Sequence, residues 1–416
     1  MKAPLLGACL LLAAPCAACA QDFVDRIDQA LTISTFHDEV RARLSGLLDL
    51  EYYNFSQPPP GLIRADGHDI LTPRLSMFLD AQLGSRVYFF AQARFDQGFD
   101  PSDRGRTQVR LDEYALRVTP WSDGRFALQV GKFATVVGGW IERHHSWDNP
   151  FINAPLSYET ATLVSDKEVP LTGQSFRAVP GFDKYEFLPI IWGPVYTHGA
   201  SIAGRVGIFE YAAEIKNAPV ASRPETWNDY DFGHPAIDLR VGLRPNPAWR
   251  FGLSAAEGSY LKADARPLQD AGSVGEYRQY LLGQDISYAR GHLQIWAEAF
   301  ESRFEIPRLG DSDVFAYYLE AKYKLTPQLF GALRWNQEWF ASGRDPAGQP
   351  VANGHDIWRA EAAFGYRFTE HTQLKLQYSL VHGDFVSENL NGTFLAQFTI
   401  RFLNLSFDGK SNNHVT

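Results

Sequence analysis

Several groups of side chains in this sequence have the chemical types of a metal site, but not its spacing. His144 and His145 are adjacent, and no third ligand follows at the spacing of a zinc site. Asp96, Asp100 and Asp103 offer oxygen ligands that calcium accepts, but a solvated acidic loop is the better explanation for them. The sequence therefore predicts no metal and no cofactor.

Motifs for nucleophilic catalysis are equally weak. Ser259 and Lys262 match S-x-x-K, but the motifs that accompany this one in serine enzymes are missing, and no G-x-S-x-G occurs. We expect no catalytic residues and no enzymatic activity. Two pairs keep an enzyme as an alternative, with no support from their spacing: His198 with Ser201, and His292 with Asp285.

Composition excludes several classes of protein. The 416 residues carry a net charge of -9, which argues against a nucleic-acid partner. A hydrophobic content of 45% is too high for a disordered chain. No run of eighteen apolar residues follows the N-terminal region, so transmembrane helices are not expected.

The N-terminal residues have the pattern of an export signal. Lys2 precedes an apolar stretch, and Ala18-Cys19-Ala20 resembles a cleavage site, so we interpret residues 1–20 as a cleaved signal peptide. A membrane anchor is the alternative, although the apolar stretch is short for one. All three cysteines lie in this region, which leaves the mature chain without thiol chemistry. Residues 21–39 would be a periplasmic lead-in.

The mature chain alternates between apolar and polar residues with a period of two. From Ala236 to Arg244, for example, four aliphatic residues alternate with Asp238, Arg240, Gly242 and Arg244. Such alternation sorts side chains onto the two faces of a β-strand, whereas a helix would scatter them. A phase slip within residues 109–118 predicts a β-bulge.

About sixteen segments show this pattern, at a length that suits tilted strands crossing a bilayer. The predicted strands begin near Val40, Arg74, Arg86, Val109, Arg125, Tyr196, Ile208, Ala236, Trp249, Gln279, His292, Val314, Leu329, Trp358, Thr372 and Leu395. Short connections such as 84–85 and 290–291 alternate with long ones such as 218–235. Short turns on one side and long loops on the other are typical of an outer-membrane barrel.

We therefore predict an all-β fold, a transmembrane antiparallel β-barrel over residues 40–407, with residues 408–416 as a C-terminal tail. Only a closed barrel satisfies every backbone hydrogen bond of a sheet in hydrocarbon. Aromatic residues near strand ends, including Tyr52, Tyr53, Phe55 and Trp249, suit two interfacial girdles. A soluble propeller or stack of sandwiches is the alternative, because alternation does not distinguish lipid from core.

The segment Ala396-x-Phe398-x-Ile400-x-Phe402 is similar to the aromatic-ended last strand of Gram-negative outer-membrane proteins. The mature chain resembles a sixteen-stranded porin, and residues 128–152 weakly resemble the phosphate-selective porin group. The resemblance implies a bacterial outer-membrane location, recognition by the barrel-assembly machinery and a homotrimer. In such porins the third extracellular loop narrows the pore, which implies the same role here for residues 134–195.

The alternation also assigns charged residues to the inner wall. The expected pore-lining residues are Arg41, Arg43, Asp49, Arg74, Asp80, Arg94, Asp96, Glu113, Arg117, Arg125, Arg240, Glu298, Glu320, Lys322, Arg334 and Arg359. The expected charged residues of the constriction loop are Glu142, Arg143, His144, His145 and Asp148. Basic residues slightly outnumber acidic ones on this wall, and the alternative is that the charges merely pair with each other.

These features predict a porin that admits small hydrophilic solutes or ions by passive diffusion, in contact with outer-membrane lipid. Its selectivity would come from pore size and from charges on the wall. A selective carbohydrate or anion channel is one alternative, since Trp296 and Phe300 could stack on sugar rings. An outer-membrane barrel enzyme is the other. The sequence does not name the solute.

Overall fold

A computed structural model describes residues 32–35, 39–55, 69–96, 108–172, 176, 187–223, 232–266, 272–344, 348–383 and 391–402. The predicted signal peptide and tail, and most of the predicted lead-in, lie outside these residues. Among the described residues, no helix has both the length and the apolar composition needed to cross a bilayer.

Strands make up most of the described chain. They are β1 (Thr32–Thr35), β2 (Val40–Phe55), β3 (Asp69–Leu83), β4 (Val87–Asp96), β5 (Gln108–Val118), β6 (Ala127–Phe133), β7 (Thr197–Val206), β8 (Phe209–Lys216), β9 (Ala236–Asn246), β10 (Trp249–Ser259), β11 (Arg278–Arg290), β12 (Leu293–Ile306), β13 (Gly310–Lys324), β14 (Leu329–Phe340), β15 (Ser342–Arg344), β16 (Pro350–Ala352), β17 (Ile357–Arg367), β18 (Thr372–Gly383) and β19 (Asn391–Phe402). Short 3₁₀ helices cover Trp140–Arg143, Leu156–Tyr158 and Val274–Glu276.

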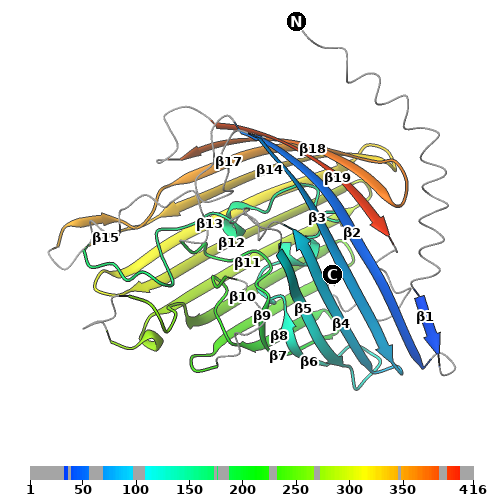
Figure 1. Ribbon diagram of the computed structural model, residues 1–416, viewed down its shortest axis with the longest axis horizontal. Helices are drawn as coiled ribbons and strands as arrows, with labels where there is room; N and C mark the ends of the chain where they lie inside the picture. Colours follow the sequence, from blue (N-terminus) through cyan, green and yellow to red (C-terminus); the bar gives the residue numbers. More distant parts are fainter. Residues whose placement is uncertain are drawn as a thin grey trace, which may run out of the picture.

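Sixteen strands, β2 to β14 and β17 to β19, close into one antiparallel ring (Figure 1). The ring closes where β19 pairs with β2, with Phe402 opposite Gly46 and Thr393 opposite Phe55. Beyond the end of β19, the same edge of β2 pairs with β1, with Thr35 opposite Val40. The predicted lead-in therefore includes a short strand that extends the wall, and β15 and β16 form a separate hairpin between β14 and β17.

The two faces of the ring differ in chemistry. On β9, Ile237, Leu239 and Val241 point outward and are about half exposed, at 52%, 48% and 57%. Between them, Asp238 and Arg240 point inward and are buried. Other strands repeat this sorting, because neighbouring side chains on a strand alternate between its faces. The apolar exterior suits acyl chains, and the closed sheet leaves no open edge in lipid.

The predicted strands correspond one to one with these sixteen. The largest offset is at β3, which begins at Asp69 rather than near Arg74. The predicted bulge is confirmed, since Gln92 pairs with Glu113 and Ala93 pairs with Leu111. Asp112 is the extra residue, and it lies next to Glu113 in the interior. At the short turns, Gly84 and Gly291 have φ values of 62° and 59°, which tight hairpins require.

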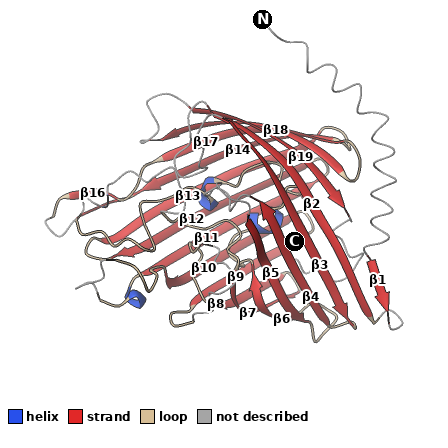
Figure 2. Ribbon diagram, in the orientation of Figure 1, coloured by secondary structure: helices blue, strands red, loops and turns tan. Residues whose placement is uncertain are grey.

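The described residues between β6 and β7 contact inward side chains of β12, β13 and β18, so they lie inside the ring, where Figure 2 draws two of the short helices. We call the described residues of this connection, 134–172, 176 and 187–196, the inner segment. Val137, Trp140, Ile141 and Tyr158 of this segment pack in one hydrophobic cluster with inward side chains of β10 to β13, including Phe300. The inner segment thus fills the part of the interior beside these strands and turns it into a core.

Candidate functional site

The inner segment is fixed where it leaves β6. Thr135 Oγ1 lies 2.7 Å from Glu214 Oε1 and 3.1 Å from Asp238 Oδ2, so both inward carboxylates meet one hydroxyl. Lys216 Nζ donates to the backbone oxygens of Phe133 at 2.6 Å and Thr197 at 3.2 Å, on the two strands that flank the segment. These contacts hold the two ends of the segment to the wall.

A pair of glycines then brings the backbone against β12. The amides of Gly139 and Trp140 donate to Glu298 Oε1 at 2.7 and 2.5 Å, and the Tyr158 hydroxyl donates to the other oxygen. Gly138 has a φ of 80°, and a Cβ there would collide with the Tyr158 hydroxyl. Glycine is therefore needed at position 138 for this close approach.

The next turn places charged side chains against opposite charges on the wall. Arg143 donates to Glu320 at 2.6 Å and to the Tyr318 hydroxyl at 3.2 Å. Its guanidinium also covers the ring of Trp296, with 4.3 Å between the guanidinium carbon and the ring centroid. The face of Trp296 is therefore occupied, which weakens the idea that this ring stacks on a sugar.

Glu142, on the same turn, accepts from Arg250 at 2.6 Å. The Glu142 side chain is 26% exposed, and partial desolvation raises the pKa of its carboxyl, an effect that the Arg250 and Arg240 guanidinium groups oppose. The adjacent pair of opposite charges, Glu142 and Arg143, thus contacts two different parts of the wall, β10 and β13. This double attachment fixes the orientation of the turn.

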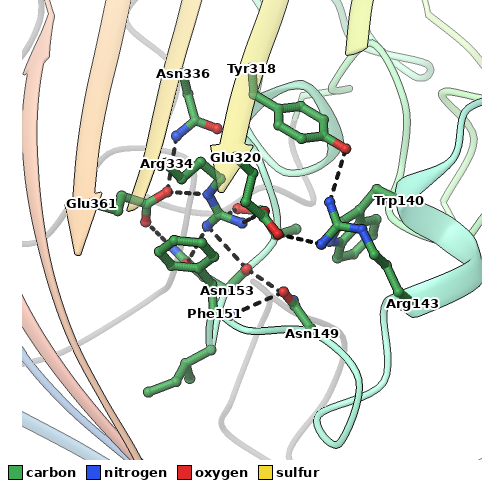
Figure 3. A network of polar contacts seen from close by, with 12 residues as sticks. Trp140, Arg143, Asn149, Phe151, Asn153, Tyr318, Glu320, Arg334, Asn336 and Glu361 are labelled. Carbon is green, nitrogen blue, oxygen red and sulfur yellow. Dashed lines mark hydrogen bonds and ion pairs between the residues drawn. The ribbon is translucent and has the colours of Figure 1, made fainter. Parts of the chain in front are cut away.

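The most deeply buried network surrounds Arg334 of β14 (Figure 3). Arg334 Nε donates to Glu361 at 2.5 Å, and its Nη1 lies 3.5 Å from Glu320. Its Nη2 donates to the Asn153 side chain at 2.7 Å, and the Phe151 ring lies against the guanidinium at 4.2 Å. The side chains of Arg334, Glu320 and Glu361 are all 0% exposed, so this network excludes water.

Two residues of β18 hold the middle of the inner segment through its backbone. Lys375 Nζ donates to the carbonyl oxygens of residues 146, 149 and 151 at 2.8, 3.0 and 3.0 Å. Gln377 accepts from the Ile152 amide at 2.7 Å. Peptide groups that would be unsatisfied in the interior are therefore paired with side chains of the wall.

A cavity of about 110 Å³ remains between the inner segment and the wall formed by β17 to β19 and β2 to β4. Its wall side carries Tyr53, Phe55, Arg74, Arg94 and Arg359, and its other side is formed by residues of the inner segment, including Trp140, His144, Trp192 and Tyr196. This cavity is the candidate passage.

Two arginines that line the cavity, Arg74 and Arg94, pair with carboxylates that are buried in the barrel wall. Arg74 lies 3.2 Å from Glu51, and Arg94 Nε lies 3.1 Å from Asp112. Glu51 and Asp112 are 0% and 1% exposed, whereas Arg74 and Arg94 are 13% and 11% exposed. The bulge on β5 thus supplies a buried counter-ion, and the guanidinium groups are the part of each pair that solvent reaches.

No family model and no curated protein sequence matches the chain. Solved structures match its fold. OmpF of Salmonella typhi, in complex with daunomycin, is 10% identical with a TM-score of 0.56, over 89% of this chain and 100% of that one. The anion-selective porin from Comamonas acidovorans is 11% identical with a TM-score of 0.53, over 88% and 100%. OmpT of Vibrio cholerae in its trimer form is 10% identical with a TM-score of 0.53, over 88% and 100%.

The chain has the sixteen-stranded barrel fold of outer-membrane porins. Most of the predicted wall residues lie on the inner face of this barrel, each next to another polar or aromatic group. Examples are Asp49 with Thr399, Asp80 with Tyr88, and Arg117 with Gln129. The same description applies to Arg43, Arg74, Arg94, Asp96, Glu113, Arg240, Glu298, Glu320, Lys322, Arg334 and Arg359.

Two predicted wall residues have other surroundings. Arg41 is exposed near the beginning of β2, at the rim of the barrel. Arg125 lies in the turn before β6, is 57% exposed and pairs with Asp123 of the same turn at 2.6 Å. The assignment of Arg125 to the wall is wrong, because β6 begins at Ala127 and the side chain is outside the strand pattern.

The predicted loop residues lie together within the inner segment. A hydrogen bond of 2.8 Å joins His144 Nε2 and Tyr196 Oη. The ring centroids of His144 and His145 are 3.9 Å apart. His145 in turn packs edge-on against Phe78 of β3. Across the described ranges, no group of three His, Cys, Asp or Glu side chains could hold a metal ion.

Sequence reasoning missed the inward aromatic residues of β2. Tyr53 and Phe55 were expected in an interfacial girdle, but both are buried and line the cavity. They share the face of Asp49 and Glu51, so the alternation itself contained the signal. The two enzyme pairs are not assembled either. His198 and Ser201 lie on opposite faces of β7. Asp285 accepts a hydrogen bond from Arg240, whereas His292, in the turn between β11 and β12, contacts the backbone oxygen of Lys324.

Proposed function

We propose that the chain is an outer-membrane porin through which small hydrophilic solutes and ions diffuse passively. The observation that carries this proposal is the closed ring with an apolar exterior and a charged interior, narrowed by an inner segment that still leaves a cavity. Such a passage selects by size at the narrowest point and by charge along its wall. We propose no catalytic step and no cofactor.

Among the alternatives, anion preference has a specific observation in its favour. Arg74 and Arg94 face the cavity with their carboxylate partners buried behind them. Glu159 also lines the cavity but is paired with Arg359, so the lining carries three guanidinium groups and one carboxylate. A positive field at a constriction favours anions.

Reconstitution into liposomes tests the proposed function. Liposomes that contain the folded protein should swell in isotonic solutions of small sugars and salts, at rates that fall with increasing solute size. Protein-free liposomes are the control. Inserted, folded protein that leaves every solute excluded would contradict the porin proposal and would favour a barrel with an enzymatic or structural role.

We further propose export through cleavage after residue 20, a location in the bacterial outer membrane and assembly as a homotrimer. The trimer form of the structurally similar OmpT supports the last point. The alternating aromatic residues Phe398 and Phe402 on β19 support the further proposal that the barrel-assembly machinery recognises this strand. Chemical cross-linking of the protein in native membranes should give a species of three chains, and only monomers would contradict the trimer.

Neutralising two arginines at the beginning of β2 should weaken anion preference. The Arg41→Gln/Arg43→Gln variant removes positive charge from exposed Arg41 at the rim and from half-buried Arg43 opposite Asp80, and leaves the network around Arg334 intact. We expect the reversal potential in a salt gradient to move modestly towards cation preference, because exposed charges are screened by salt. The matched control is Arg303→Gln, on the exterior of β12. An equal change in both variants would contradict a role for the rim charges.

Acid should increase anion preference through Asp148. Asp148 is exposed to solvent inside the barrel; partial desolvation by the surrounding protein raises the pKa of its carboxyl, and Arg401, Arg367 and Lys322 oppose that shift. As pH falls through this raised pKa, Asp148 loses its negative charge while the surrounding cations keep theirs. The interior around Asp148 then becomes more positive, at a higher pH than an ordinary carboxyl would produce.

Reversal potentials measured as a function of pH check this expectation. The Asp148→Asn variant should show the acid-like anion preference already at neutral pH and should lose that part of the pH dependence. If the variant follows the same pH curve as the unmodified protein, Asp148 is not the titrating group.

A further inference from the structure

We infer that the cavity beside the inner segment is a binding site for organic acids that combine a flat apolar body with one carboxylate. This inference rests on the proposed function and deepens it, since it names the class of solute that would bind on its way through. Three features of the cavity carry it: aromatic residues on opposite sides, one guanidinium with an unoccupied edge, and one buried N–H without an acceptor.

The aromatic residues come from two different parts of the chain. On the wall side, Tyr53 and Phe55 have nearly parallel rings, with centroids 6.1 Å apart and an angle of 18°. On the other side, Trp140 and Tyr196 belong to the inner segment, and Trp192 lies near them in the cavity lining. A flat apolar group between these sides would contact rings on both, which general diffusion does not require.

Arg94 offers a fixed guanidinium to an anion. Its Nε lies 3.1 Å from Asp112 Oδ2 in an ion pair without a hydrogen bond, and no hydrogen bond joins its two terminal nitrogens to an acceptor among the described residues. These two nitrogens form the edge of the guanidinium that a carboxylate binds in a bidentate manner. Because Asp112 keeps the group in place, less side-chain entropy is lost on binding.

Trp140 supplies the third feature. Its side chain lines the cavity and is 5% exposed, and its indole Nε1–H has no acceptor among the described residues. A buried donor without a partner is unfavourable, so a solute oxygen that accepts from it adds to the affinity. Arginine and indole donors together favour an acceptor-rich solute, and the aromatic sides favour an apolar body.

Calorimetric titration of the folded protein in detergent tests the site independently of conduction. The probes are benzoate, acetate, benzyl alcohol and maltose. We expect saturable binding of benzoate, with acetate and benzyl alcohol at least about tenfold weaker, because each lacks one of the two recognised groups. Tight binding of maltose without benzoate would overturn the inference, and so would equal binding of acetate and benzoate.

Two variants and two matched controls assign the contacts. Arg94→Gln should weaken benzoate binding about tenfold and Trp140→Phe about fivefold, because a charged hydrogen bond contributes more than a neutral one. Asp112 keeps Arg110 at 3.2 Å, so Arg94→Gln leaves it with a partner. Arg303→Gln and Trp249→Phe, both on the exterior, should bind benzoate like the unmodified protein. Uniform affinity across all four variants would overturn the site.

Block of ion current by benzoate then separates this inference from the proposed function. Current that falls with increasing benzoate, at concentrations that match the calorimetry, supports both. Current without benzoate binding means that the porin proposal stands and the site is wrong. Benzoate binding without any current means that the site stands and passive conduction is wrong.

Discussion

Replacing residues 140–158 with a short glycine–serine linker should raise single-channel conductance severalfold. These residues supply the Glu298, Glu320 and Lys375 contacts that hold the inner segment across the interior. Without them, the segment no longer fills the space beside β14, β17 and β18, and the water-filled cross-section increases there. Conductance in planar bilayers measures the change directly.

Shortening the β15–β16 hairpin, residues 342–352, is the matched control. This hairpin forms its own two-stranded sheet outside the ring, so its removal should leave conductance nearly unchanged. An unchanged conductance after replacement of residues 140–158, in protein shown to be folded, would mean that the inner segment does not limit the passage.

The second large effect is expected from Arg334→Met. Arg334 neutralises Glu361 and Glu320 in a network with no exposed side-chain surface. Its removal leaves two buried carboxylates facing each other with fewer counter-charges, and Arg143 and Arg359 compensate only in part. Breaking a buried pair in this way costs about 3–5 kcal/mol of unfolding free energy. Denaturant unfolding in detergent or lipid vesicles measures the loss.

Arg125→Gln provides a closely matched control. Arg125 and Asp123 lie 2.6 Å apart, as close as the buried pair, but their side chains are 57% and 50% exposed. An exposed pair contributes only about 0–1 kcal/mol, so this variant should unfold almost like the unmodified protein. Adding Glu361→Gln to Arg334→Met should recover part of the lost stability. Equal losses for Arg334→Met and Arg125→Gln would contradict the account of the buried network.

The ring was predictable from sequence because lipid and the closed sheet impose a rule on neighbouring residues. The alternation on β9 and the phase slip near Asp112 can both be recognised within about ten residues of sequence. Even β3, whose beginning was placed at Arg74 instead of Asp69, was assigned to the right position in the order of strands.

The path of the inner segment could not be predicted, because its contacts are non-local. Lys375 binds the backbone of Ser146, and Arg359 binds Glu159, across separations of 229 and 200 residues. Nothing near residue 146 in sequence identifies these partners. Inside the barrel, charged groups of the inner segment pair with charged groups of the wall. The wall was expected to present scattered charges to water, but these charges form buried networks instead.

The sequence also could not show which side chains near the strand ends point into the barrel and which point into solvent or lipid. Arg125 precedes β6 by one turn residue, and a boundary error of that size moves its side chain from the interior to solvent. Tyr53 and Phe55 show the opposite error. Aromatic residues at a strand end suggest an interfacial girdle, but the face they share with Asp49 determines where they point.

The central claim is that ions cross through the cavity between the inner segment and the wall. All three cysteines lie within the first 20 residues, so protein produced without those residues has no thiol background. A single cysteine at Thr393, which lines the cavity, can then be modified by a cationic methanethiosulfonate during recording in a planar bilayer. Leu319→Cys, whose side chain lies on the exterior and is 51% exposed, is the control. We predict a stepwise loss of current for Thr393→Cys and none for Leu319→Cys; a channel that is silent, or that keeps its full current after Thr393→Cys is shown to be modified, would contradict the claim.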